Sequence, residues 1–120
     1  MDIFCKIING EIPSKKIFED DTVMVIMDVA PRSSGHCLVI PKNHYQDLYD
    51  IEEEVLNHIL KISKQIANLL TEKLNCTGIT LEENNGSCQE VKHFHLHIIP
   101  KYNKEESMGI DEAFNKITKK

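Results

Sequence analysis

Three histidines alternate with apolar residues near the end of the chain, and this run constrains the fold more than any other segment. Single apolar residues separate His93, His95 and His97, and two isoleucines and a proline follow. Successive side chains of a strand point to opposite faces of a sheet, so the run predicts a strand over residues 91–100. Its apolar side chains are expected to pack into a core, with the three imidazoles lining the other face.

The imidazoles of this predicted strand are candidates for chemistry, because three titratable rings on one face are hard to explain by packing alone. Histidine titrates near neutral pH. Two imidazoles at alternate positions of a strand can both reach a zinc ion. Alternatively, the middle ring attacks phosphorus as a nucleophile, one flanking ring moves a proton, and the other fixes its orientation. The residues alone leave both options open.

The rest of the chain predicts an α+β fold with a mostly antiparallel sheet. Short apolar or β-branched runs bounded by turn residues indicate further strands, at residues 16–19, 22–27, 36–40 and 78–83. The clearest helix covers residues 51–74, where apolar residues recur three and four positions apart, and Asp50 is its expected N-cap. A short terminal helix is expected over residues 110–117. The broad apolar stripe of the long helix suits a monomer core, or a sheet on one side and a second subunit on the other.

Length and composition exclude several classes of protein. The chain has 120 residues and a net charge of −5, which fits one domain. The acidic balance argues against a nucleic acid polymer as a partner, although a mononucleotide remains compatible. No apolar run is long enough to span a membrane. The N-terminus has no signal-peptide pattern, so we expect a cytoplasmic protein whose four cysteines are free thiols or metal ligands.

Five segments resemble the histidine triad (HIT) superfamily of nucleotide hydrolases and transferases. They are the opening residues 2–13, the segments 28–31, 35–44 and 84–89, and the triad itself at 93–99. They occur in the family's order, and the match extends over residues 2–102. The short chain is similar to the Hint branch, which resembles adenosine phosphoramidases. The resemblance implies a HIT-like fold in a single domain, residues 1–120, with a five-stranded sheet, one long helix and a short N-terminal helix. It also implies a homodimer, in which the tail 103–120 is mobile or contacts the partner.

The resemblance assigns catalytic roles to four histidines. His95 attacks the α-phosphorus of a nucleoside phosphoramidate or a related phosphoanhydride. A covalent nucleotidyl-histidine forms, and water then releases the nucleoside monophosphate. His97 assists proton transfer to the leaving group. His93 holds the His95 ring through its backbone carbonyl, and His36 supports the triad from a neighbouring strand. This chemistry requires no cofactor.

The same resemblance implies a pocket for a purine nucleotide such as AMP or GMP. Asp28 accepts hydrogen bonds from the ribose hydroxyls, for which a carboxylate is well suited. The base walls and the ribose–phosphate contacts fall on Phe4, Ile7, Met27, Val29, Asn84, Gln89 and Val91. The chain departs from the family at Glu90, where a serine that helps the leaving amine is common, and in a shorter loop over 84–89. A carboxylate at that position is repelled by phosphate unless it is protonated, paired with Lys92 or turned away.

A structural zinc site is also implied. Many small bacterial members carry two cysteines near the start. In this chain Asp2 replaces the first of them, while Cys5, His44 and His93 remain. These nitrogen and sulfur ligands, with a carboxylate, make up a tetrahedral zinc set. The alternative is that the site has been lost and Cys5 is a buried thiol.

Three functions therefore stay open. The first is a hydrolase that works through a nucleotidyl-histidine. The second is a regulatory module that binds a nucleotide with weak catalysis, which Glu90 and the shortened loop favour. The third is a zinc-dependent hydrolase that uses the histidine row as metal ligands, and activity that resists chelation would remove it.

Overall fold

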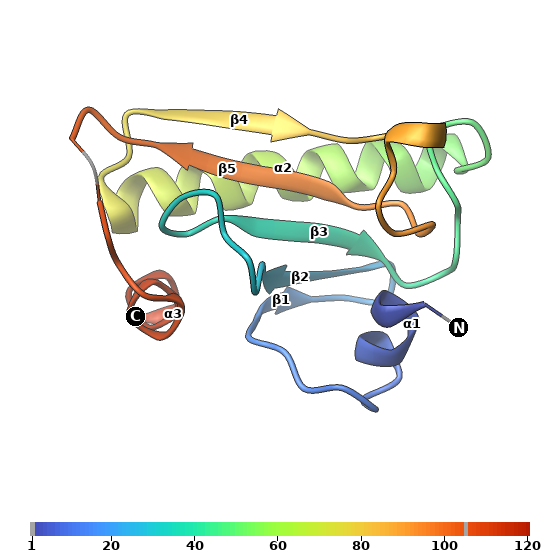
Figure 1. Cartoon of the computed structure of the whole chain (residues 1–120), viewed down its shortest axis with the longest axis horizontal. Coiled ribbons are helices and arrows are strands. Elements are labelled where there is room, and N and C mark those ends of the chain that lie inside the picture. The colour runs from blue at the N-terminus through green and yellow to red at the C-terminus, as the bar shows by residue number, and fades with distance from the viewer. Residues whose placement is uncertain (1, 105) are drawn as a thin grey trace.

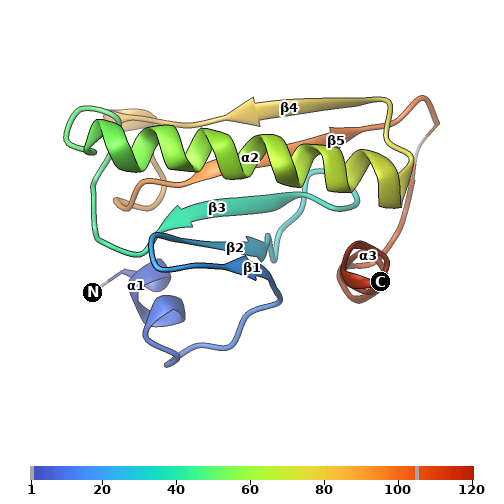
Figure 2. The same ribbon diagram turned by 180° about the vertical axis from the view of Figure 1, so that it is seen from behind.

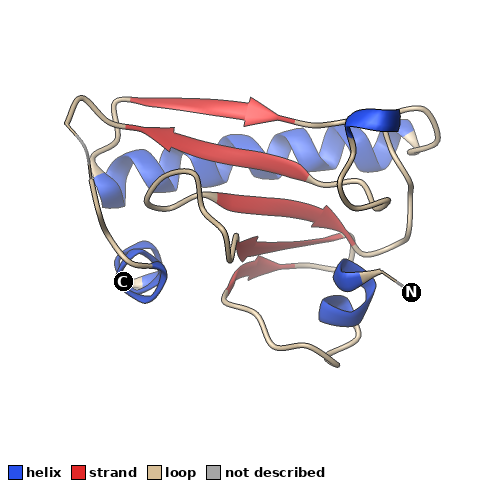
Figure 3. Cartoon of the chain, in the orientation of Figure 1, coloured by secondary structure: helices blue, strands red, loops and turns tan. Residues whose placement is uncertain are grey.

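An antiparallel sheet of five strands forms the centre of the structure, in the order β1-β2-β3-β5-β4 (Figure 1). The computed structural model describes residues 2–104 and 106–120. The strands are β1 (Lys16–Glu19), β2 (Val23–Met27), β3 (Cys37–Pro41), β4 (Gly78–Glu82) and β5 (Leu96–Lys101). The helices are α1 (Ile3–Ile8), α2 (Glu53–Leu74) and α3 (Ile110–Thr118), with a short 3-10 helix η1 (Gly86–Cys88) (Figure 3). The predicted α+β fold, with its long helix and short N-terminal helix, is confirmed.

Helix α2 covers one face of the sheet (Figure 2). Its apolar side joins the main buried cluster, which includes Val25, Val39, Ile59, Leu70 and Ile98. Helix α3 packs against α2 and β1, and two of its side chains, Ala113 and Ile117, are buried in the same cluster. The terminal helix of the tail therefore contributes to the core of its own chain, whereas Glu105 lies outside the described residues. None of the helices in the described part of the chain combines the length and apolar character needed to cross a membrane.

The other face of the sheet carries α1 and a second apolar cluster. Phe4 of α1 packs with Met24, Ile26, Leu38 and Ile40, which are strand residues of the face opposite α2. His97 lies on this face as well, because it pairs with Leu38 between β3 and β5 and paired residues point to the same side of a sheet. The sheet thus separates a core under α2 from a site beside α1.

The strand that carries the histidines begins later than the sequence predicted. β5 starts at Leu96 rather than at residue 91, so His97 is the triad histidine in the ladder. Upstream, the N–H of Phe94 donates to the carbonyl of Tyr45 (2.7 Å), which ties this segment to the loop after β3 instead of to a strand. Phe94 is buried in the main core as the alternation predicts. All three imidazoles of the triad are buried, and those of His95 and His97 line the same cavity.

The long helix also begins later than predicted, at Glu53 rather than at residue 51. Its N-cap is Glu52, whose side chain makes no capping hydrogen bond. Asp50 instead accepts from the backbone N–H groups of Gln46 and Asp47 (3.0 and 2.9 Å). It therefore stabilises the turn that precedes the helix, and the expected capping role of Asp50 is wrong.

Candidate active site

A cavity of about 240 Å³ opens on the α1 side of the sheet. Apolar side chains from α1, from the loop that follows it and from β2 and β3 make up most of its wall. Nine residues predicted for the site line it: Phe4, Ile7, Met27, Asp28, Val29, Glu90, Val91, His95 and His97. Three segments that are distant in sequence thus meet around one cavity.

The chain itself sets the tautomer of His95. Its Nδ1 lies 2.8 Å from the carbonyl oxygen of His93, and since a carbonyl only accepts, Nδ1 carries the proton. Nε2 therefore holds the free lone pair, and no described residue hydrogen-bonds it. The ring packs against Phe4 and against His97, with centroids 4.9 Å apart in both pairs. These contacts hold a nucleophilic nitrogen in a fixed orientation.

A chain of hydrogen bonds sets the tautomer of His97 in the same way. The backbone N–H of Arg32 donates to Nδ1 of His36 (3.0 Å), so a neutral His36 carries its proton on Nε2. That nitrogen donates to Nδ1 of His97 (2.9 Å). The proton of His97 is therefore on Nε2, which provides one N–H donor for a ligand in the cavity that His97 lines.

Burial keeps these three rings neutral. It lowers the pKa of His95 below the ordinary value, although the hydrogen bond to the His93 carbonyl opposes the shift. Burial, aided by the charges of His95 and His36, lowers the pKa of His97 to about 4. Burial also lowers the pKa of His36, against the opposing charge of Asp28. At neutral pH the site therefore offers a lone pair on His95 and an N–H donor on His97.

Asp28 follows β2 and lies beside the histidine pair. Its Oδ1 accepts from the N–H of Ala30 (2.8 Å). Its Oδ2 lies 3.4 Å from Nε2 of His36 and 3.9 Å from Nδ1 of His97. A carboxylate oxygen can accept more than one hydrogen bond, so Asp28 retains acceptor capacity for hydroxyl groups of a ligand.

Glu90, an exposed residue, also lines the cavity. Pairing with Lys92, one of the three alternatives for this carboxylate, is not formed, because Lys92 donates to the carbonyl of Gly86 (2.8 Å). The guanidinium of Arg32 is bound by Glu82 through two hydrogen bonds of 2.8 and 2.6 Å, and this carboxylate pairing lowers the pKa of Glu82 to about 2. The lining therefore contains two carboxylates and, among the described residues, no lysine or arginine.

Asn84 and Gln89, two of the predicted ribose–phosphate contacts, do not line the cavity. Asn84 donates to the carboxylate of Glu82 (3.4 Å). Gln89 is buried, and its Nε2 donates to the carbonyl of Gln46, whereas its Oε1 is buried without a hydrogen-bond partner. The hydrogen bond from Gln89 fastens the short loop before the triad to the segment after β3, and neither side chain lines the cavity in this conformation.

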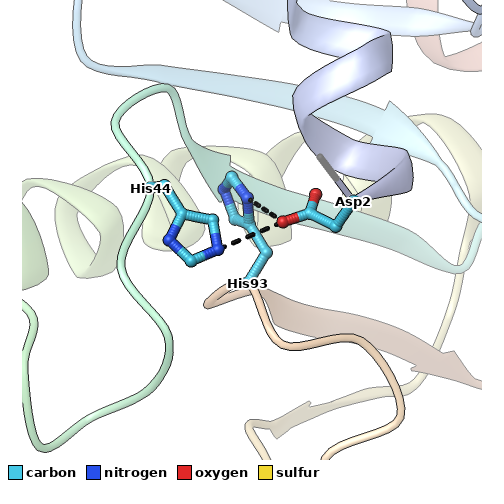
Figure 4. Close-up of side chains that lie close together, drawn as sticks. All are labelled: Asp2, His44 and His93. Carbon is cyan, nitrogen blue, oxygen red and sulfur yellow. Dashed lines mark hydrogen bonds and ion pairs between the residues drawn. The ribbon is translucent and has the colours of Figure 1, made fainter.

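A second cluster of polar side chains lies at the start of α1 (Figure 4). Oδ2 of Asp2 is 3.2 Å from Nε2 of His44 and from Nδ1 of His93. The ligand atoms of these three residues lie within 4.8 Å of one another. Sγ of Cys5 is 3.5 Å from Asp2 Oδ2 and from His93 Nδ1. Three of the four predicted metal ligands, Asp2, His44 and His93, are thus brought together, and Cys5 contacts two of them.

Protonation decides how well this cluster suits a metal ion. Nε2 of His93 donates to the carbonyl of Pro41 (2.9 Å), so its Nδ1 is the unprotonated nitrogen and is ready to bind. Such a hydrogen bond from the second ring nitrogen is typical of metal-bound histidine. His44 differs, because its Nε2 lies 2.8 Å from the carbonyl of Lys92 and must release that bond to act as a ligand. The donors fit zinc once His44 releases this bond and the Cys5 thiol, whose pKa burial and the charge of Asp2 raise, loses its proton.

Part of the cavity wall consists of residues that the sequence did not single out. Six further residues line it: Ile3, Ile12, Pro13, Ser14, Ile26 and Leu38. The strand residues could have been found, because Leu38 lies two positions after His36 and Ile26 two positions before Asp28, which places each on the site face. The loop after α1 has no such periodicity. No sequence pattern predicts the hydrogen bond that the backbone N–H of Arg32 donates to His36.

Comparison with known proteins gives these features a context. The HIT domain, as a family model, matches residues 9–104. An uncharacterised HIT-like protein of Methanocaldococcus jannaschii is 45% identical over 104 residues, which cover 85% of this chain and 80% of that protein. An adenosine 5′-monophosphoramidase of Schizosaccharomyces pombe is 38% identical over 110 residues, covering 90% of this chain and 80% of that protein. The crystal structure of a Zn-bound histidine triad family protein from Mycobacterium smegmatis matches with a TM-score of 0.90 and 31% identity, over 97% of this chain and 89% of that chain. The chain therefore belongs to the HIT family.

Proposed function

We propose that the protein hydrolyses purine nucleoside phosphoramidates, with His95 as the nucleophile and the nucleoside monophosphate as a product. The observation that carries the proposal is the pairing of a neutral His95, whose Nε2 lone pair is free, with a neutral His97, whose Nε2 bears a proton. Both line a mainly apolar cavity, as binding of a flat base requires. The Schizosaccharomyces pombe relative, named an adenosine 5′-monophosphoramidase, supports the same substrate class.

The proposed reaction consists of two displacements at phosphorus. The Nε2 lone pair of His95 forms a bond to the α-phosphorus while the phosphorus–nitrogen bond breaks. The electron pair of that bond goes to the amine, which takes up one proton from solvent by way of His97. Water then attacks the phosphorus of the histidine adduct. The nucleoside monophosphate leaves, His95 regains its lone pair, and the protons of the water return to solvent.

The nucleoside is held by the remaining wall of the cavity. Phe4, Ile7 and Val29 provide apolar surface for the base. Asp28 accepts hydrogen bonds from the two ribose hydroxyls, since its carboxylate retains free lone pairs. This arrangement supports binding of AMP or GMP as a product and does not by itself select between the two bases.

Release of AMP from adenosine 5′-phosphoramidate tests the proposal. The protein is treated with a chelator, and His95→Asn and the matched variant His58→Asn, which alters a histidine of α2, are measured beside it. We expect release by the wild type and His58→Asn and loss in His95→Asn. Binding of AMP without release by any protein would instead support the nucleotide-binding module. Activity that disappears on chelation would support the zinc-dependent hydrolase.

We also propose a structural zinc ion at the cluster of Asp2, Cys5, His44 and His93. Bound there, the ion would connect α1 to the segment before β5, and metal binding of this kind adds to folding stability. Metal analysis of protein prepared with zinc tests this proposal. One equivalent should be retained, and Cys5→Ser should retain less than the wild type. Equal zinc in both proteins would contradict the ligand set.

A homodimer that forms through β4 is a further proposal. β4 is an edge strand, and such a strand offers unpaired backbone groups to a second chain. Leu81 on β4 and Leu60 on α2 are both 48% exposed. Large apolar side chains at these positions suit an interface better than they suit contact with water.

A further inference from the structure

Glu90 lines the cavity with His95 and His97 while it stays exposed to solvent, and it takes part in neither hydrogen-bond chain that sets their tautomers. Over residues 2–104 and 106–120, no hydrogen bond or ion pair engages it. Lys92 is bound to the Gly86 carbonyl, and Arg32 is held by Glu82. A carboxylate without a counterion acts electrostatically on whatever occupies the cavity.

The charge of Glu90 acts at the histidine side of the cavity. Burial lowers the pKa of His95, and the carboxylate of Glu90 opposes that shift. The hydrogen bonds that Arg32 donates to Glu82 raise the pKa of Arg32, and the charges of Asp28 and Glu90 raise it further. Among the residues that line the cavity, Asp28 and Glu90 are therefore the two whose negative charges act on His95.

The charge balance of this region restricts the substrate. A nucleotide brings a negatively charged phosphate into a cavity lined by two carboxylates and by no described lysine or arginine. An anionic leaving group, as in ADP, adds further repulsion, and a neutral amine leaves the imbalance uncorrected. A leaving group that carries its own positive charge offsets both the phosphate and Glu90.

We infer that Glu90 is a specificity-determining residue that favours phosphoramidates whose leaving amine bears a second, protonated amino group. The inference rests on the proposed function and adds no covalent step to it. The same phosphorus–nitrogen bond breaks, and the amine departs with the same added proton. Glu90 contributes only a charge beside the leaving group.

Two AMP amides of similar length test this inference. One is made from 1,3-diaminopropane and has a free ammonium group, and the other is made from N-acetyl-1,3-diaminopropane and is neutral there. The measured quantity is the ratio of kcat/KM for the first amide to kcat/KM for the second. Comparing this ratio between proteins cancels the intrinsic reactivity of the two amines, because each protein receives the same pair.

The substitution Glu90→Gln should lower this ratio by about twofold to fivefold, as expected for one charge pair that involves a solvent-exposed carboxylate. The matched variant Glu72→Gln removes the same charge from an exposed position of α2, on the far side of the sheet, and should leave the ratio unchanged. Added salt should reduce the ratio of the wild type, because salt screens the pair. An equal ratio in the wild type and Glu90→Gln would overturn the inference. An equal decrease in both variants would also overturn it, since net charge alone would then explain the effect.

Failure of the proposed function can be distinguished from failure of this inference. If the wild type cleaves neither amide, the proposed function is wrong. Calorimetric affinities of the same two amides for the wild type and Glu90→Gln then decide the role of Glu90. A preference for the ammonium compound that Glu90→Gln removes supports the inference, and the absence of a preference in the wild type overturns it.

Discussion

Replacing His36 by alanine tests the hydrogen-bond chain that orients His97. The substitution leaves Nδ1 of His97 without its donor at a position where the residue is 8% exposed. A buried polar atom without a partner costs roughly 1–3 kcal/mol. If that whole cost falls on the transition state, kcat decreases by about 5- to 150-fold, because each 1.36 kcal/mol corresponds to a factor of ten. KM should change less, because His36 does not line the cavity.

The assay for His36→Ala combines kinetics with a direct view of the ring. Steady-state rates on adenosine 5′-phosphoramidate give kcat and KM separately. Nitrogen NMR of labelled histidine reports the tautomer of His97, which should carry its proton on Nε2 in the wild type and become a mixture in the variant. The matched variant His58→Ala removes a histidine that pairs with Asp20 (2.7 Å) and should retain both kcat and the His97 tautomer.

Two results would refute this reasoning. One is a wild-type His97 with its proton on Nδ1, because the Arg32–His36–His97 chain then runs in the opposite direction. The other is an unchanged kcat in His36→Ala with a shifted tautomer. In that case the orientation of His97 does not contribute to the rate.

Three further outcomes concern the pH profile, the fold and the assembly. Protonated His95 cannot attack, and burial lowers its pKa. The value of kcat/KM should therefore stay constant as the pH falls through the ordinary histidine pKa and decrease only at lower pH. A midpoint above about pH 6.5 would contradict this. Gly35 has a φ of +90°, and a Cβ there would lie 2.4 Å from Cδ1 of Leu74. The substitution Gly35→Ala should therefore lower the free energy of unfolding, measured in urea, by about 1–3 kcal/mol. Unchanged stability would show that the Leu74 side chain at the end of α2 moves aside at little cost. Leu81→Lys should shift a dimer toward monomer in sedimentation equilibrium, because a charge on an edge strand opposes pairing, and an unchanged mass would place the interface elsewhere.

Much of the fold follows from local pattern. Alternation over the triad segment placed Phe94 and Ile98 in the core under α2, because a strand-like backbone turns successive side chains to opposite sides. The same periodicity brought His36 and Leu38 to one face. Helical spacing predicted α2 because its apolar stripe has to be buried against the sheet.

The differences arise from contacts between segments distant in sequence. The hydrogen bond from Phe94 to Tyr45 shortens β5, and no local preference of either residue predicts it. Asp50 satisfies two backbone donors before the helix rather than within it, since the preceding turn competes for the same carboxylate. The side chain of Gln89 donates to the carbonyl of Gln46. This contact depends on how the loop before the triad packs against the segment after β3.

The central claim is that His95 forms a covalent bond to phosphorus, and trapping that adduct tests it most directly. A single turnover of adenosine 5′-phosphoramidate is stopped within milliseconds by alkaline denaturant, in which a phosphorus–nitrogen bond to histidine survives, and the peptide that contains His95 is analysed by mass spectrometry. The structure predicts one nucleotidyl group on His95 that forms and decays at rates compatible with kcat. Full product release with no adduct at any time in the turnover would contradict the account, since water would then attack phosphorus directly.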